Sequence, residues 1–128
     1  MNKTVVAVVL ALGLLQSVLA AIPLDGRVYD EYLKTQPGKE RKLFLKEAFG
    51  GGQFDMRDLF ELVAATKEGE WDVKKAALLD KLVRRGIGRT GGPQSDCGKR
   101  IVAIRERVVE PIKKKHNIIV DGVHSYST

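Results

Sequence analysis

The sequence predicts a small, mainly α-helical domain: a bundle of four to five short helices with a glycine-rich loop at residues 86–98. Three observations support this fold class. Apolar residues recur at intervals of three and four, the spacing that places them on one face of a helix. Three segments begin with an apolar residue followed by aspartate, which is a helix-start signal. Glycines and prolines, which end helices, separate the apolar segments.

The three helix-start signals are Leu24-Asp25, Phe54-Asp55 and Trp71-Asp72. An aspartate stabilises the start of a helix because its carboxylate accepts hydrogen bonds from free backbone N–H groups of the first turn. The preceding apolar residue can pack on the residue four positions beyond the cap. We therefore predict that all three aspartates are N-caps.

The first two helices are expected over Gly26–Thr35 and Glu40–Phe49. Pro37-Gly38 ends the first helix and Gly50–Gly52 ends the second, because these residues disfavour a continued helix. The apolar faces of the two helices comprise Val28, Tyr29, Tyr32, Leu33, Leu43, Phe44, Ala48 and Phe49.

The third and fourth helices are expected after Asp55, to about Lys67, and over Val73–Arg85. Arg84 and Arg85 suit the negative end of the fourth helix dipole, and Gly86 would supply a left-handed C-cap. The short connection makes the two helices a hairpin. Their apolar positions are Met56, Leu59, Phe60, Val63 and Ala64 in the third helix, and Ala76, Leu79 and Val83 in the fourth.

Residues 86–98 hold five glycines and Pro93, a composition typical of a loop. Lys99–Glu110 favours a helix capped by Asp96 and ending near Pro111. A strand is the alternative for this segment, because valine and isoleucine are abundant in it.

The C-terminal end of the chain contains a short β-prone segment and a tail. Ile118–Val120 consists of β-branched residues, which are enriched in strands. We expect residues 121–128 to form a loose tail.

The N-terminus has the pattern of a secretory signal peptide. One positive residue, Lys3, precedes the apolar run Val5–Leu15, and small residues follow up to Ala20. This run is shorter than the ~20 residues that span a bilayer, and no second apolar run of that length follows. We therefore predict a signal peptide at residues 1–20, a single mature domain at residues 21–128 without a transmembrane segment, and a secreted, extracellular protein. A cut after Ala21 and an uncleaved membrane anchor are the alternatives for this segment.

Charge is unevenly distributed along the predicted mature chain. Residues 21–70 hold 8 basic and 10 acidic side chains, whereas residues 71–128 hold 13 basic and 6 acidic ones. A basic half of this kind attracts anionic surfaces. The candidate binding surface comprises Lys74, Lys75, Arg84, Arg85, Arg89, Lys99, Arg100, Arg105, Arg107, Lys113, Lys114 and Lys115.

Cys97 is the one cysteine, so no intramolecular disulfide can form. A single cysteine in a secreted chain is a candidate for intermolecular pairing, here a disulfide-linked homodimer; an unpaired thiol is the alternative. The mature domain must depend on packing, or on a partner, for its stability.

No residue pattern points to catalysis, a metal or a cofactor. His116 and His124 are eight residues apart and distant from Cys97, which is no known metal-ligand spacing. The glycines of residues 86–92 match neither a dinucleotide-binding nor a phosphate-binding motif. We predict that the protein is not an enzyme and has no catalytic residues, metal or cofactor.

The resulting hypothesis is a secreted, small, cationic, non-enzymatic binding protein. Its basic C-terminal half would bind an acidic polysaccharide, an anionic surface or an extracellular protein, whereas the expected export argues against nucleic acid. One alternative is a peptide precursor cut at dibasic sites, since Arg84-Arg85 and Gly98-Lys99-Arg100 resemble processing signals. The other is a membrane-active toxin or antimicrobial protein.

Overall fold

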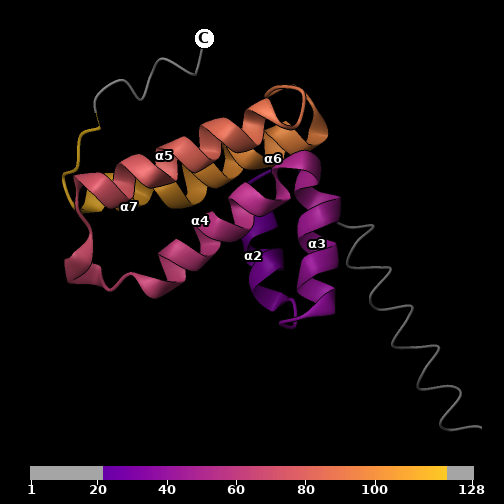
Figure 1. The fold of residues 1–128 in the computed structure, drawn as a ribbon, viewed down its shortest axis with the longest axis horizontal. Coiled ribbons are helices and arrows are strands. Elements are labelled where there is room, and N and C mark those ends of the chain that lie inside the picture. Colours follow the sequence, from indigo (N-terminus) through magenta and orange to yellow (C-terminus); the bar gives the residue numbers. More distant parts are fainter. Residues whose placement is uncertain (1–21, 121–128) are drawn as a thin grey trace, which may run out of the picture.

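A computed structural model describes residues 22–120 of the chain (Figure 1). The predicted signal peptide, residues 1–20, and the predicted tail, residues 121–128, lie outside the described residues. Within the described part all regular structure is helical, which confirms the predicted helical bundle. The elements are α2 (Arg27–Lys34), α3 (Lys39–Phe49), η1 (Gly50–Gly52), α4 (Gln53–Ala65), η2 (Glu68–Glu70), α5 (Val73–Gly88), α6 (Asp96–Ile104), η3 (Arg105–Val109) and α7 (Glu110–Lys115).

The helices form two groups (Figure 1). α5 lies beside the run of α6, η3 and α7, and the chain passes along the two in opposite directions. α2 and α3 lie side by side, steeply inclined to this pair, and contact α6, while α4 leads from α3 toward the start of α5. The closest packing is between α4 and α5, as expected for the predicted hairpin.

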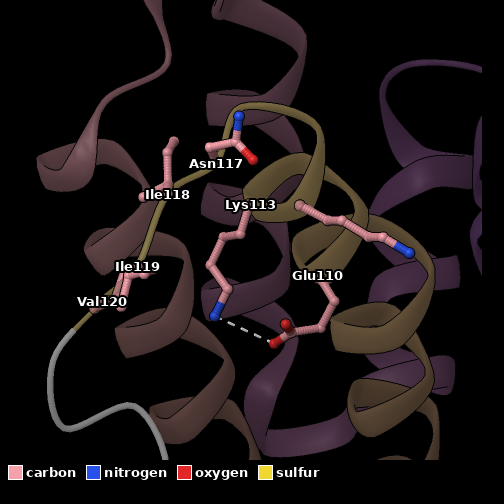
Figure 2. A pocket seen from close by; sticks show the side chains of 7 residues that line it. Glu110, Lys113, Asn117, Ile118, Ile119 and Val120 are labelled. Atoms are coloured by element: carbon pink, nitrogen blue, oxygen red, sulfur yellow. Dashed lines mark ion pairs between the residues drawn. The ribbon is translucent and has the colours of Figure 1, made fainter.

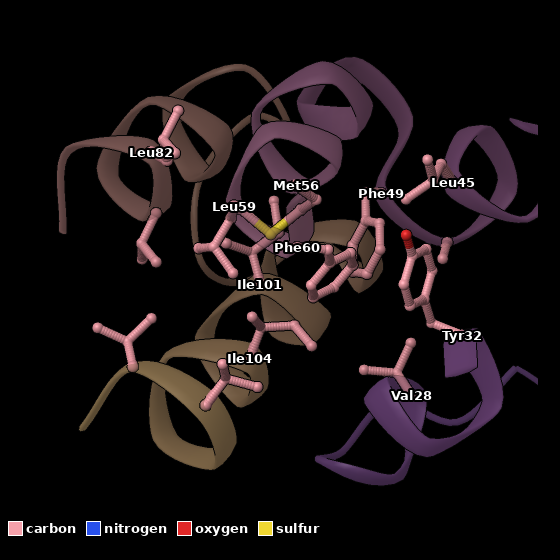
Figure 3. Close-up of a cluster of buried hydrophobic side chains, with 14 of the residues drawn as sticks. Val28, Tyr32, Leu45, Phe49, Met56, Leu59, Phe60, Leu82, Ile101 and Ile104 are labelled. Carbon is pink, nitrogen blue, oxygen red and sulfur yellow. The ribbon is translucent and has the colours of Figure 1, made fainter. Parts of the chain in front are cut away.

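The core lies where these helices meet (Figure 3). Tyr32 of α2 and Phe60 of α4 pack with ring centroids 4.2 Å apart, and Phe49 of α3 lies 6.0 Å from Phe60. Aromatic pairs at such distances stabilise a core beyond the area that they bury. The largest fully buried side chains are Phe44, Phe49, Met56, Leu59, Leu79, Ile101, Ile104, Val28, Val83 and Val109.

The three predicted aspartate caps have different outcomes. Asp72 caps α5 as predicted, because its carboxylate accepts a hydrogen bond of 2.8 Å from the Lys75 N–H. Asp25 accepts from the Arg27 N–H at 3.0 Å, although it stands one residue before the cap of α2. The prediction for Asp55 is wrong: α4 begins earlier, at Gln53, because the turn η1 leads directly into it, and Asp55 is buried inside the helix.

The glycine-rich loop is shorter than predicted, because helix enters it from both sides. α5 continues through Gly86 to Gly88, and α6 begins at Asp96, which leaves residues 89–95 between them. Gly86 is therefore not a C-cap; it is buried against Met56 and Ile101, where a Cβ would lie 3.3 and 3.1 Å from their methyl carbons. The cap of α6 is Ser95 and not Asp96, since the Ser95 hydroxyl accepts from the Gly98 N–H.

The segment that could have been helix or strand is helical, and it does not end at Pro111. α6, η3 and α7 follow one another without interruption up to Lys115. η3 is a π-helical turn in which the Glu110 N–H reaches the Arg105 carbonyl, five residues back. Proline has no N–H to donate, and the wider turn before Pro111 accommodates it in the first turn of α7. The β-prone residues Ile118–Val120 form no strand with any described residue.

Candidate functional site

Exposed cations gather on one side of α5. Residues at helical spacing share a face, and Ala76, Leu79 and Val83 are buried on the opposite side. Lys81 belongs to this surface although the sequence prediction omitted it, and Lys75 is partly buried at its edge. We call the following five exposed residues the α5 cationic face: Lys74, Lys81, Arg84, Arg85 and Arg89.

Two arginines of the α5 cationic face are held by Asp55 of α4. The Asp55 carboxylate is 3% exposed, 3.7 Å from Arg85 Nε and 3.2 Å from Arg89 Nη1. The two arginine side chains remain about half exposed. A guanidinium has more N–H donors than these contacts use, so both arginines are ordered on the protein side and can still donate toward solvent.

The acidic residue within α5, Asp80, does not offset the charge of this surface. Asp80 is buried, and both of its carboxylate oxygens lie 3.3 Å from Lys113 Nζ of α7. Lys113 is 3.2 Å from Glu110 as well. Burial raises the pKa of Asp80 more than the Lys113 ammonium lowers it. Burial alone would lower the pKa of Lys113, but the two carboxylates outweigh this effect and raise it.

Two predicted surface cations, Arg100 and Lys113, are structural. Lys113 is 7% exposed and pairs with Asp80, so its inclusion in a binding surface is wrong. The Arg100 guanidinium donates to the carbonyls of Ile22, Pro23 and Ala48 at 3.2, 2.9 and 3.2 Å. These hydrogen bonds connect Ile22, Pro23 and the end of α3 to α6. They occupy most of the Arg100 donors.

The other predicted cations on α6 to α7 are interspersed with acids. Arg107 pairs with Asp30 of α2 at 3.0 Å, Lys115 pairs with Glu68, and Arg105 is mostly shielded beside Glu106. Lys99 and Lys114 are exposed and form no ion pair among residues 22–120. The predicted cations of α5 therefore lie together on one surface, whereas those of α6, η3 and α7 are separated from one another by acidic partners or by burial.

A pocket of about 420 Å³ lies between α7 and the segment that follows it (Figure 2). The ion pair of Lys113 and Glu110 forms one side, and Ile118, Ile119 and Val120 form the other. Ile119 is 83% exposed, so the apolar side is open to solvent. The polar groups in this pocket serve the buried pair with Asp80, and we assign no ligand to it.

Cys97 and His116 do not form a catalytic pair. They stand at opposite ends of the run from α6 to α7, nineteen residues apart, which a rise of 1.5 Å per residue converts to about 28 Å. His124 lies outside the described residues. Cys97 is half-buried with its sulfur packed over Gly50, where a Cβ would lie 3.2 Å from it. The predicted disulfide-linked homodimer stays a prediction.

Comparisons of this chain with protein-family models, curated proteins and solved structures give no match. Among residues 22–120 no three histidine, cysteine or acidic side chains are grouped as metal ligands. In the same part of the chain no helix has the length and apolar character needed to cross a bilayer.

Proposed function

We propose that this chain is a secreted, non-enzymatic protein that binds an acidic extracellular partner through the α5 cationic face. One observation carries the proposal: α5 and its C-cap residue Arg89 present five exposed cations, and the one acid within the helix, Asp80, is buried and paired with Lys113. The buried Asp55 of α4 contacts two of these cations, Arg85 and Arg89. Long-range attraction between such a surface and a polyanion raises both affinity and association rate.

The shape of the surface favours a linear acidic polysaccharide. Lys74, Lys81 and Arg85 are separated by seven and four residues, and at 100° per residue they project within about 40° of one another. From Lys74 to Arg85 the helix rises about 17 Å. A straight row of cations of this length matches the spaced charges of an extended sulfated chain.

A membrane is a poorer fit to α5 than a polysaccharide. Helices that lie in a bilayer interface bury a broad apolar face among the lipids. The apolar face of α5 is already occupied by the core. The exposed large apolar residues of α5 are Val73 at its start and Leu78 within the cationic row, which do not form a broad apolar face. The same packing disfavours the membrane-active alternative, because α5 would have to leave the bundle to place its apolar face among lipids.

The folded context favours an intact protein over a peptide precursor. Arg84-Arg85 lies inside α5, and Lys99-Arg100 lies in the first turns of α6. Proteases cut exposed, locally opened segments, and the Arg100 side chain is fastened to three carbonyls. We expect the intact mass of secreted material to correspond to a chain that begins at Ala21 or Ile22. Fragments that end at either dibasic pair would support the precursor instead.

Binding to immobilised heparin tests the proposal. We expect the mature protein to bind at low salt and to dissociate as salt rises. In the double variant Lys74→Gln/Lys81→Gln, the slope of log affinity against log salt should fall by about two, one for each cation removed from the polyanion contact. Neither lysine forms an ion pair within the described residues, so the fold should persist.

The matched control is the double variant Lys39→Gln/Lys46→Gln. Both residues are exposed on α3, and the substitutions change the net charge by the same amount. We expect the salt slope to stay at the wild-type value. Failure of the wild-type protein to bind at low salt would refute the proposed function, and an equal loss in both double variants would refute the assignment to α5.

A further inference from the structure

A second pocket, of about 320 Å³, lies between α3 and α4 at the turn that joins α2 to α3. This volume is at the lower end of the range for small-molecule sites. None of its residues belongs to the α5 cationic face. The lining residues are Tyr32, Pro37, Gly38, Arg41, Lys42, Leu45, Arg57 and Glu61.

Arg41 is already ordered in this pocket. Its Nε donates to the Thr35 hydroxyl at 3.0 Å and its Nη2 donates to the Thr35 carbonyl at 2.7 Å. Thr35 is buried, and the guanidinium carbon lies 4.9 Å from the centre of the Tyr32 ring. These two bonds use two of five N–H donors, so three remain for a ligand. Because the side chain is held in place, ligand binding would cost little of its conformational entropy.

Tyr32 places a second donor beside Arg41. Its ring is buried, and its hydroxyl forms no hydrogen bond with any residue from 22 to 120. Figure 3 shows this hydroxyl on the side of the ring that faces Leu45, which also lines the pocket. Burial raises the pKa of Tyr32, so the phenol keeps its proton at neutral pH and can donate it in a hydrogen bond.

The charges around the pocket favour a ligand with a single negative charge. Arg57 pairs with Asp58 at 3.1 Å, so the remaining charged residues that line the pocket are Arg41, Lys42 and Glu61. The charges of Arg41, Lys42 and Glu61 sum to one positive charge. Glu61 repels any anion, but it repels a doubly charged phosphate about twice as strongly as a singly charged carboxylate, which Arg41 and Lys42 together can offset.

We propose that this pocket binds a small organic monocarboxylate with an apolar body. The Arg41 guanidinium would donate two parallel hydrogen bonds to the carboxylate, the geometry in which arginine binds this group most strongly. The Tyr32 hydroxyl would provide a further donor and Lys42 a further charge. Leu45 and Pro37 would contact the apolar body. This site is independent of the proposed polyanion binding.

Titration with hexanoate, followed by backbone amide NMR shifts, tests the proposal. We expect saturable shifts confined to residues 32–45 and 57–61, the segments that line the pocket. Hexan-1-ol, which has the same apolar chain and no charge, should bind about tenfold or more weakly, since hydrogen bonds to charged groups are roughly twice as strong as neutral ones. Shifts that do not saturate, or equal binding of the alcohol, would overturn the site.

Three variants assign the binding to named side chains. Arg41→Lys keeps the charge and loses the two-pronged geometry, and should weaken hexanoate binding about tenfold. Tyr32→Phe removes only the hydroxyl, and Lys42→Gln removes only a charge at an exposed position, so both variants should fold. Each should weaken hexanoate binding about threefold to tenfold, which tests the site even if Arg41→Lys fails to fold. Lys39→Gln, an exposed residue of α3 outside the pocket, is the control. Unchanged affinity in Tyr32→Phe and Lys42→Gln would refute the proposal.

Discussion

Replacing Lys113 with alanine is expected to lower the free energy of unfolding by about 3–5 kcal/mol. The substitution leaves the Asp80 carboxylate buried, with the partner that holds both of its oxygens removed. A buried charge without its partner retains the desolvation penalty and loses the attraction that offset it. A small domain of this size is stable by about 5–15 kcal/mol, so the loss would be a large share of the total. Urea unfolding followed by circular dichroism measures it.

Lys114→Ala is the matched control, because the neighbouring lysine is exposed and has no ion pair among the described residues. Its effect should stay within about 0.5 kcal/mol. The double variant Asp80→Leu/Lys113→Met removes both charges and replaces the two side chains with apolar ones of similar shape, and should recover most of the lost stability. Equal effects of the two single lysine substitutions would contradict the assignment of Lys113 as a buried partner.

The same pair predicts a dependence of stability on alkaline pH. The pKa of Lys113 is raised in the folded protein above its ordinary value of 10.5. Its contribution to stability is therefore complete below about pH 10.5 and is lost as pH rises through the folded pKa. We expect wild type and Asp80→Leu/Lys113→Met to keep a constant stability difference from pH 6 to 9, and this difference to shift in favour of the variant at higher pH. A constant difference up to pH 12 would contradict the prediction.

The fold class and most helix positions could be predicted because local signals determine them. The apolar stripe of α4 and the Asp72 cap of α5 each arise from residues within one or two turns. Asp55 has the same local signature as Asp72, yet α4 begins two residues before it, and its buried carboxylate pairs with Arg85 and Arg89, which are 30 and 34 residues away. Such distant partners leave no trace in the local pattern. Gly86 was misassigned for the same reason, since its contacts are with Met56 and Ile101.

The sequence shows how many charged residues the chain has, but the fold determines which of them face solvent. The candidate site could therefore be predicted only in part. Lys113, Lys114 and Lys115 are adjacent in sequence, but helical geometry turns Lys113 toward Asp80 and leaves Lys114 exposed. Arg100 looked like a surface cation, whereas three carbonyls occupy its guanidinium. The pocket around Arg41 joins three helices, and the sequence alone offered no signal for it.

The second large effect is expected at Gly52, where three helical segments meet. A Cβ on this residue would lie 2.9 Å from the Gly86 carbonyl oxygen, 3.1 Å from the Gly86 Cα and 2.8 Å from the Ile101 terminal methyl. The methyl of Ile101 can rotate away, but the backbone of Gly86 can move only if α5 moves away from α4. Gly52→Ala should therefore lower the free energy of unfolding by about 2–3 kcal/mol, the cost of overpacking a filled core.

Gly88→Ala provides the matched comparison two residues beyond Gly86 in α5. No atom would lie within 4 Å of its Cβ, and its backbone angle is not in the left-handed region. This variant should gain about 0.4–1 kcal/mol, because alanine loses less conformational freedom than glycine on folding. Replacing glycine with alanine is therefore expected to lower the free energy of unfolding at residue 52 and to raise it at residue 88. Urea unfolding measures both effects. Equal effects would mean that α4 and α5 are not in the close contact that also brings Asp55 to Arg85 and Arg89 of the α5 cationic face.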